Sequence, residues 1–534
     1  MTSPKFKQLN PFELKSALTN LLNKINSVQD VPNCLADFEM LDAQEDKTLL
    51  SKLLFKELVT AKVEKIPVIC FLLEHYTPKD ELINKLWETL KTPELSSEIK
   101  ITIINLLREL DADWSYETCE EYLGDESADI LDENTKNLLN TAIINPEVQI
   151  DFLDFMASIK VQDKITLLNS FGEDFSEDAL ANILIPVFVS NPNSAEGKEA
   201  LKILGTTKSQ LALHILEEMS KCAKGELSQE VRRALSTLKI SGIREDNTKE
   251  FYKKILADSK PHKFYITYPD GHGDMALIFT RKTTDSKIRF VSIVINIETG
   301  VKDCFGFFEI SQFECDKILE RFLRDEKTVD IAPEAFKTIL HNAEMLTISR
   351  NNNNWKLPYE YVCWKNLLLD IENDTDDIKQ ILKEQILPKK PDSSTISKLE
   401  DIKVSSHWFL DANYSDEFED LIRDLKSTDN IDQLVENFNG KVFYYEEKIC
   451  WIDKLLMCAY IKYSIGKDDE ASLLYGLSQD DGQLREMFTH ILKRSVYEYL
   501  MTIKYNKDLN AENFSPEEIE KKLKYIEEKW VQHV

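Results

Sequence analysis

The sequence predicts a mainly α-helical protein with a small antiparallel α+β module in its middle. Apolar residues recur at helical spacing from Pro11 to about Gly242, and again after Asn354. Between Pro261 and Phe308 the spacing changes to alternation, and aromatic and β-branched residues dominate. Only 14 glycines and 16 prolines occur among 534 residues, which is typical of a largely helical chain.

The length of the chain predicts several domains, because 534 residues are too many to pack around one ordinary hydrophobic core. We expect a helical repeat domain over residues 1–250 and a module of antiparallel sheet plus helix over 261–350. A helix and linker follow over 351–400, and a C-terminal helical domain covers 401–534. The linker prediction rests on LPKKPDSSTISK at Leu387–Lys398, which combines two prolines with a polar run.

The formal net charge of -28 bears on the partners of the protein. A surface this negative repels phosphate backbones, so we expect no nucleic-acid partner. The nine cysteines form no CxxC motif and lie mostly in apolar helical context, which is typical of reduced thiols in a cytosolic protein. No stretch reaches about 18 uninterrupted apolar residues, and the N-terminus lacks a secretory apolar core. We therefore expect a cytoplasmic location and no membrane segment.

Two segments of the N-terminal half match at a shift of 34 residues. The matched positions are Ala200, Leu201 and Leu204 in the first segment, and Ala234, Leu235 and Leu238 in the second. LALHILEEMSKCA, a second amphipathic helix, lies between them. The unit is helix, turn, helix, with a small residue where helices must approach closely, and such a hairpin must stack on neighbours to bury its apolar face. An ordinary helical bundle is the alternative arrangement.

This unit resembles the HEAT repeat, and the resemblance covers Ser97–Ile243. It implies a helical solenoid, elongated and with an extended surface for binding other proteins.

Three alternating runs predict strands, namely Phe264–Tyr268, Met275–Arg281 and Lys287–Ile297. Turn residues separate them, so the simplest arrangement is an antiparallel meander of about four strands. A helix follows at Ser311-Gln-Phe-Glu314, which has the pattern of a capping box. The apolar residues of that helix that we expect to cover one face of the sheet are Phe313, Ile318, Leu319 and Phe322.

The stretch PDGHGD, from Pro269 to Asp274, is the strongest candidate for chemistry in the chain. Glycine and aspartate suit a tight turn, which accounts for Asp270 and Gly271. In an extended strand, Asp270, His272 and Asp274 would share one face, and they could bind a divalent metal there.

The possible fourth ligands of such a site are Asp303, Cys304 and His341. Cys304 acting as a nucleophile with His272 as its base is the alternative chemistry. No HExxH, HxH, GxSxG or phosphate-binding loop occurs, so we expect a turn or a binding loop rather than a catalytic site, and no cofactor. The binding-loop candidates are Asp270, His272, Asp274 and Asp303.

The block from Tyr268 to Phe308 also resembles a small α/β module found in bacterial HEAT-repeat proteins. The similarity rests on DGHGD followed by ETGVKDCFG. It implies that these turns belong to one module, and it implies no activity.

The C-terminal region contains a helical hairpin. CWIDKLLMCAYIKYSIG ends at Gly466, and DDEASLLYGLS follows at once. This hairpin resembles a single tetratricopeptide repeat, with Ala459, Gly466 and Ala471 as its small packing residues.

The leading functional hypothesis is a cytosolic scaffold or adaptor that binds a protein partner and has no catalytic activity of its own. The alternative is a metal-dependent hydrolase with its site in the 261–350 module, where a bound cation would lower the pKa of a water molecule. A third hypothesis, nucleic-acid processing on a helical repeat, is opposed by the acidic composition. The oligomeric state does not follow from the sequence.

Overall fold

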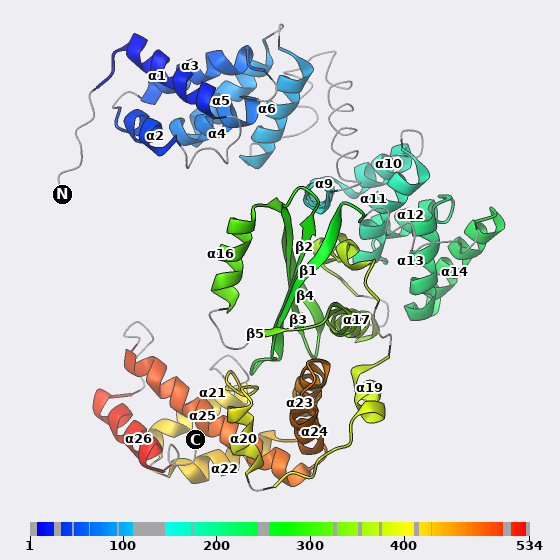
Figure 1. Cartoon of the computed structure of the whole chain (residues 1–534), viewed down its shortest axis with the longest axis vertical. Coiled ribbons are helices and arrows are strands. Elements are labelled where there is room, and N and C mark those ends of the chain that lie inside the picture. Colours follow the sequence, from blue (N-terminus) through cyan, green and yellow to red (C-terminus); the bar gives the residue numbers. More distant parts are fainter. Residues whose placement is uncertain are drawn as a thin grey trace. The chain divides into compact units, whose positions relative to one another are not determined.

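The computed structural model divides the chain into two compact units, Met1–Leu138 and Leu139–Val534 (Figure 1). The boundary between them falls within the expected 1–250 region. The structure describes residues 8–25, 34–44, 47–62, 65–92, 95–110, 145–171, 175–243, 256–323, 328–350, 355–372, 376–392, 394–410, 416–428, 430–505 and 514–529.

The described part of the first unit is helical. It forms α1 (Pro11–Lys24), α2 (Leu35–Asp42), α3 (Lys47–Val59), α4 (Ile66–Tyr76), α5 (Lys79–Leu90) and α6 (Ser97–Glu109). Asn10 caps α1 by accepting from the backbone of Glu13, whose carboxylate accepts from Asn10 N at 3.0 Å. Leucine and isoleucine side chains from α1 and α3 to α6, with Phe38 and Leu41 of α2, make one continuous core.

A stack of helices opens the second unit. Its members are α9 (Pro146–Ser158), α10 (Val161–Ser170), α11 (Glu177–Ser190), α12 (Ala195–Leu204), α13 (Gln210–Cys222) and α14 (Gly225–Ile240). Successive helices from α11 to α14 pack in pairs, and α10, α11 and α12 also contact α12, α13 and α14, respectively. A Cβ at Gly205, the C-cap of α12, would lie 2.9 Å from that of Ala234, so this one of the predicted small residues stands where α12 and α14 approach closely.

The middle of the unit is an antiparallel sheet in the order β4-β3-β2-β1-β5. Its strands are β1 (Ser259–Thr267), β2 (Asp274–Thr283), β3 (Ile288–Asn296), β4 (Gly300–Ile310) and β5 (Thr328–Asp330). The predicted meander is therefore confirmed. Its fifth strand escaped prediction because three residues are too few to show alternation.

Helices cover both faces of this sheet (Figure 1). On one face lies α16 (Gln312–Leu323), with Cys315 and Leu319 packed on Ile278, Ile288 and Phe290. The expected role of Phe313 in this contact is wrong, because it lies in the first turn and is 67% exposed. Helices α17 (Pro333–Arg350) and α18 (Tyr359–Trp364) pack against the opposite side.

The capping box at the start of α16 is confirmed. Ser311 N donates to Glu314 Oε2 at 2.9 Å, and Glu314 N donates to Ser311 Oγ at 3.2 Å.

The described residues after α18 are again mostly helical. A 3₁₀ turn (Lys365–Leu368) precedes α19 (Ile378–Gln385), α20 (Thr395–Asp401), α21 (Asp416–Ser427), α22 (Ile431–Val442), α23 (Tyr445–Ser464), α24 (Asp468–Leu477), α25 (Asp481–Tyr505) and α26 (Pro516–Lys529). The hairpin of α23 and α24 is confirmed, with Ala459 and Ala471 fully buried. The expected linker is packed rather than loose, since Lys389 N donates to Ser472 O at 2.9 Å.

None of the helices that the structure describes is long and apolar enough to cross a membrane. The cysteines in these ranges form no disulfide with one another, and Cys119 lies outside them.

Candidate functional site

The stretch 268–273 is a turn that joins β1 to β2. Asp270 Oδ1 accepts from the backbone N–H groups of His272 and Asp274, both at 2.9 Å, and Gly273 N donates to Asp270 O at 3.0 Å. Gly273 has a φ of +81°, which favours glycine. The interpretation of Asp270 and Gly271 as turn residues is confirmed. The expectation that Asp270, His272 and Asp274 share a strand face is wrong, because β2 begins only at Asp274.

The four binding-loop candidates are not brought together as a ligand set. Asp274 accepts from Asn296 Nδ2 at 2.7 Å and pairs with Lys302 at 2.7 Å. Asp303 lies inside β4 rather than in a turn, and its carboxylate accepts from Cys304 N at 2.8 Å. Within the described ranges, no group of three or more His, Cys, Asp and Glu side chains is arranged to hold a metal ion. His272 and Asp303 are exposed.

Cys304, the candidate nucleophile, is buried in β4 beside Asp303. Burial raises the pKa of its thiol well above the usual value, and the negative charges of Asp303 and Glu360 add to this rise. The thiolate, which is the reactive form, is therefore disfavoured.

The turn is docked against the C-terminal helices instead of standing free. Gly271 N donates to His407 O at 3.0 Å, and Trp408 Nε1 donates to Pro269 O at 2.9 Å. The ammonium group of the fully buried Lys454 donates to Gly271 O and lies 3.7 Å from the centroid of the Trp451 ring. Most of this turn therefore serves internal packing.

A large cavity lies elsewhere in the second unit. It encloses about 1410 Å³ between the stack (α9, α11 and α13), the ends of β3 and β4, helix α17 and the segment 361–372. The ionisable side chains in its wall are His214, Glu218, Lys221, Cys222, Asp258, Arg289, Glu309, Glu334, Lys337, His341, Glu344, Tyr361, Cys363, Lys365, Asp370 and Glu372. Of these residues, His341 is the one that the sequence offered as a possible metal ligand.

One wall of the cavity contains a buried ion pair. Lys365 Nζ lies 2.6 Å from Glu344 Oε1, and Tyr361 donates from its hydroxyl to Glu344 Oε2 at 2.7 Å. Burial opposes the charge of Lys365, yet the carboxylates of Glu344 and Glu218 raise its pKa overall. Burial also raises the pKa of Tyr361 well above its usual value, with Glu344 adding to the effect. Lys365 therefore stays charged and Tyr361 stays neutral near neutral pH, which suits binding better than proton transfer.

Two arginines stand directly opposite one another on β2 and β3, next to this cavity. Arg281 is fully buried and makes a bidentate pair with Asp370 at 2.8 and 2.9 Å. Arg289 pairs with Asp258 at 2.6 Å, and both arginines donate to Ser259 Oγ at 3.1 Å. Like charges opposite one another destabilise a sheet, so the two aspartates are needed here. The alternation of MALIFTR signals the inward direction of Arg281, because Leu277 and Phe279 share its face.

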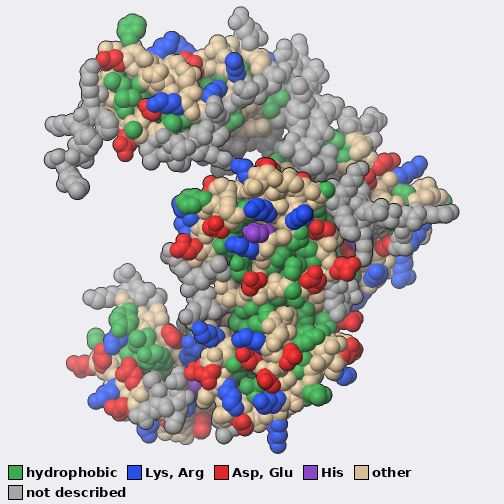
Figure 2. Space-filling model, viewed as in Figure 1, with side chains coloured by type: hydrophobic (Ala, Val, Ile, Leu, Met, Phe, Trp, Pro, Cys, Tyr) green, Lys and Arg blue, Asp and Glu red, His purple; other side chains and the backbone are tan. Residues whose placement is uncertain are grey.

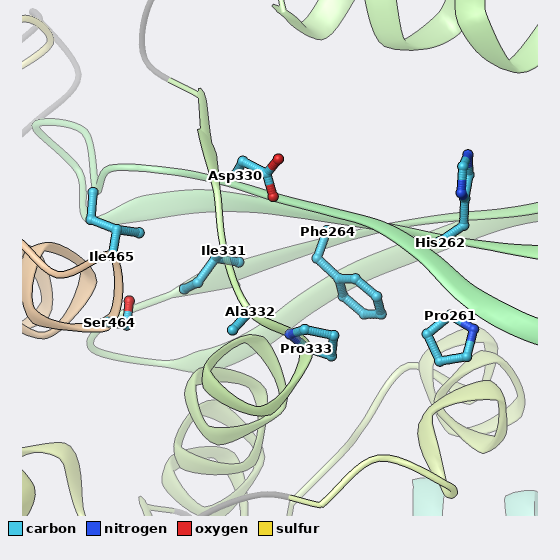
Figure 3. A pocket seen from close by; sticks show the side chains of 9 residues that line it. All are labelled: Pro261, His262, Phe264, Asp330, Ile331, Ala332, Pro333, Ser464 and Ile465. Carbon is cyan, nitrogen blue, oxygen red and sulfur yellow. The ribbon is translucent and has the colours of Figure 1, made fainter.

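A second cavity of about 560 Å³ lies where β1 and β5 meet the end of α23 (Figure 3). His262 and Asp330 project from separate strands and stand apart in this view. Burial, followed by the charges of Lys263 and Lys282, lowers the pKa of His262. The cavity is otherwise lined mainly by apolar residues such as Pro261, Phe264, Ile331 and Pro333, and it forms no acid–base pair.

Two phenylalanines are exposed side by side on the edge strand β4, and a third is exposed in the first turn of α16. Phe305 is 44% exposed, Phe307 is 37% exposed, and their ring centroids lie 6.2 Å apart. Both rings contact Phe290 on the neighbouring strand. Phe313 follows in the first turn of α16. We call Phe305, Phe307 and Phe313 the aromatic patch, and the predicted residue Asp303 precedes it on β4.

Comparisons with protein-family models, with curated proteins and with solved structures return no match for this chain.

Proposed function

We propose that the protein is a scaffold that binds a partner protein through the aromatic patch. Large exposed apolar groups that lie together mark interaction sites on soluble proteins, whereas single ones are ordinary. Aromatic residues are also enriched among the residues that dominate binding energy at interfaces. The exposure of Phe305, Phe307 and Phe313 is the observation that supports the proposal.

The partner would contact side chains rather than add a strand to the sheet. The edge of β4 is partly occupied, because Val301 N donates to Thr347 Oγ1 at 2.9 Å and Phe308 N donates to Glu147 Oε1 at 3.1 Å. Strand addition needs a row of open backbone groups. The patch therefore suits a partner that presents apolar side chains of its own.

The helical stack would be the second part of the scaffold. The packing of α10 on α12, α11 on α13 and α12 on α14 supports an arrangement of stacked hairpins, as a HEAT-like solenoid requires. We include the solenoid, and a cytoplasmic location, in the proposal.

A nucleic-acid partner is not part of this role. The net charge is -28, and Figure 2 shows Lys and Arg side chains interspersed with Asp and Glu over the described surface in view. The carboxylates of Asp270 and Asp274 already have backbone, amide and ammonium partners, which argues against a metal-dependent hydrolase at this turn.

The test is affinity purification from cells that express the full-length chain, with bound proteins quantified by mass spectrometry. We expect a near-stoichiometric partner with the wild type, and its loss from Phe305→Ser/Phe307→Ser. Leu387→Ser, which changes a still more exposed apolar residue outside the patch, should retain the partner. Equal thermal unfolding of the variants would show that they fold. Retention of the partner by the double variant would refute the role of the patch.

A further inference from the structure

We propose that the 1410 Å³ cavity binds a zwitterion, a compound with a primary ammonium group and a carboxylate, between Glu218 of α13 and Lys337 of α17. This inference does not rest on the scaffold role. It starts from two opposite charges that line one cavity and do not touch.

Glu218 supplies the negative charge. Its side chain is 48% exposed and lies in the cavity wall, so a solute can reach it. Among the residues that the structure describes, it forms one ion pair, with His214 Nε2 at 3.3 Å, one turn earlier on the same helix. Although burial opposes ionisation, the hydrogen bond from His214 and the charges of His214, Lys365 and His341 lower the pKa of Glu218 to about 2.

Lys337 supplies the positive charge. Its ammonium group donates to Ile371 O at 2.5 Å, and no carboxylate in the described ranges forms an ion pair with it. An ammonium group has three donors, so two remain for other acceptors. Burial lowers the pKa of this amine, and the negative charge of Glu218 is the largest influence in the other direction. A bound anion would favour the charged form.

Two other carboxylates of the wall are already compensated. Glu344 is paired with Lys365, and Asp370 is paired with Arg281. Lys221, Glu309 and Glu334 also line the cavity. His214, His341 and Lys365 act on the ionisation of Glu218. Glu218 and Lys337 are opposite charges in one wall that form no ion pair with each other, so both remain open to a ligand.

A zwitterion satisfies both groups at once. Its ammonium end would meet Glu218, and its carboxylate would meet Lys337, with charge-assisted hydrogen bonds at each end. The apolar residues of the wall, which include Ile215, Met219, Leu340 and Met345, would receive the rest of the ligand. The volume exceeds the roughly 300–1,000 Å³ of ordinary small-molecule sites, so both free amino acids and short peptides fit this chemistry.

The test is titration calorimetry of the full-length chain with the L-amino acids and with dipeptides and tripeptides that have free ends. We expect at least one to bind with a Kd of about 1 mM or lower. Its amide, which lacks the carboxylate, and its N-acetyl form, which lacks the ammonium group, should each bind at least about tenfold more weakly. Binding by single amino acids or only by peptides would identify the source of the ligand.

Variants assign the two ends. With Glu218→Gln, the N-acetyl form should bind as well as the unmodified ligand, because the group that meets the ammonium end is gone. With Lys337→Gln, the amide should bind as well as the unmodified ligand, because the group that meets the carboxylate is gone. Lys302→Gln, which changes a cation on β4 outside the cavity, should leave both modified forms binding more weakly than the unmodified ligand. Failure of the whole panel to bind at about 10 mM, or equal binding of the amide and N-acetyl forms on the wild type, would overturn the proposal.

Discussion

Replacing Gly271 by alanine should separate the β1–β2 turn from the C-terminal helices. A Cβ at this position would lie 3.0 Å from the carbonyl carbon of Phe409 and closer still to its oxygen. Ordinary carbon–carbon contacts are about 3.5–4.0 Å, so the backbone of one partner must shift. The obstacle is backbone rather than the end of a flexible side chain.

The cost follows from the hydrogen bonds that the shift would break. They are Gly271 N to His407 O at 3.0 Å, Trp408 Nε1 to Pro269 O at 2.9 Å, and the bond from buried Lys454 to Gly271 O. At about 1 kcal/mol each, with more for the charged donor, we expect a loss of about 2–4 kcal/mol in the free energy of unfolding.

Urea unfolding followed by tryptophan fluorescence measures this loss, because Trp408 and Trp451 lie at the contact, with ring centroids 5.6 Å apart. Gly482→Ala is the matched control. Its new Cβ would meet nothing nearer than 3.4 Å and would lie in the first turn of a helix, so stability should stay equal or rise by up to about 1 kcal/mol. A Gly271→Ala protein within about 0.5 kcal/mol of the wild type would refute the packing argument.

Three further predictions concern the wall of the large cavity. Lys365→Met should lower the free energy of unfolding in urea by about 3–5 kcal/mol, because it leaves the carboxylate of Glu344 buried without its cation. Arg281→Lys should cost about 2–3 kcal/mol in the same assay, because an ammonium group cannot make the bidentate pair with Asp370. Thermal unfolding between pH 6 and 2 should show stability from Glu218 that is full above the unfolded-state pKa of about 4.3 and is lost as the pH falls through the folded-state value of about 2, since that pKa is lowered by folding.

These predictions have their own controls and contrary outcomes. Lys302→Gln removes an exposed ion pair, so it should change stability by less than about 1 kcal/mol. If Lys365→Met lowers the free energy of unfolding no more than this control does, the carboxylate of Glu344 does not depend on Lys365 for its charge compensation. Full retention of stability by Arg281→Lys would contradict the bidentate geometry. Glu218→Gln should flatten the difference between pH 4.5 and 2, and an unchanged acid limb would exclude Glu218 as its source.

Local patterns in the sequence predicted the local structure of this protein. The helical periodicity, the alternation of the three predicted strand runs and the capping box at Ser311 each involve residues a few positions apart, so short windows contain the whole signal. The prediction that Phe313 covers the sheet was wrong, because periodicity identifies an apolar helix face but does not show whether a residue in the first turn reaches the sheet. The prediction of a shared strand face for Asp270, His272 and Asp274 was wrong, because the glycines of this stretch form a turn and the strand begins only at Asp274.

The cavity could not be predicted, because tertiary packing brings its walls together. Glu218 and Lys337 lie on helices separated in the sequence by α14, all five strands of the sheet and α16. Pairs such as His214 with Glu218 are common on exposed helix faces, and their spacing alone does not distinguish a cavity from solvent. The contact of Gly271 with His407 could not be predicted either, because tertiary packing brings these two distant residues together.

The β1–β2 turn also sets an order of events during synthesis. Trp408 binds Pro269 across 139 residues, and Lys454 binds Gly271 across 183. The sheet therefore leaves the ribosome long before the residues that bury its turn, at a synthesis rate of about 5–20 residues per second. During those seconds the turn, which Trp408 and Lys454 will later cover, is in contact with water or a chaperone. A message truncated before the codon for Trp408 would leave both of these contacts unmade.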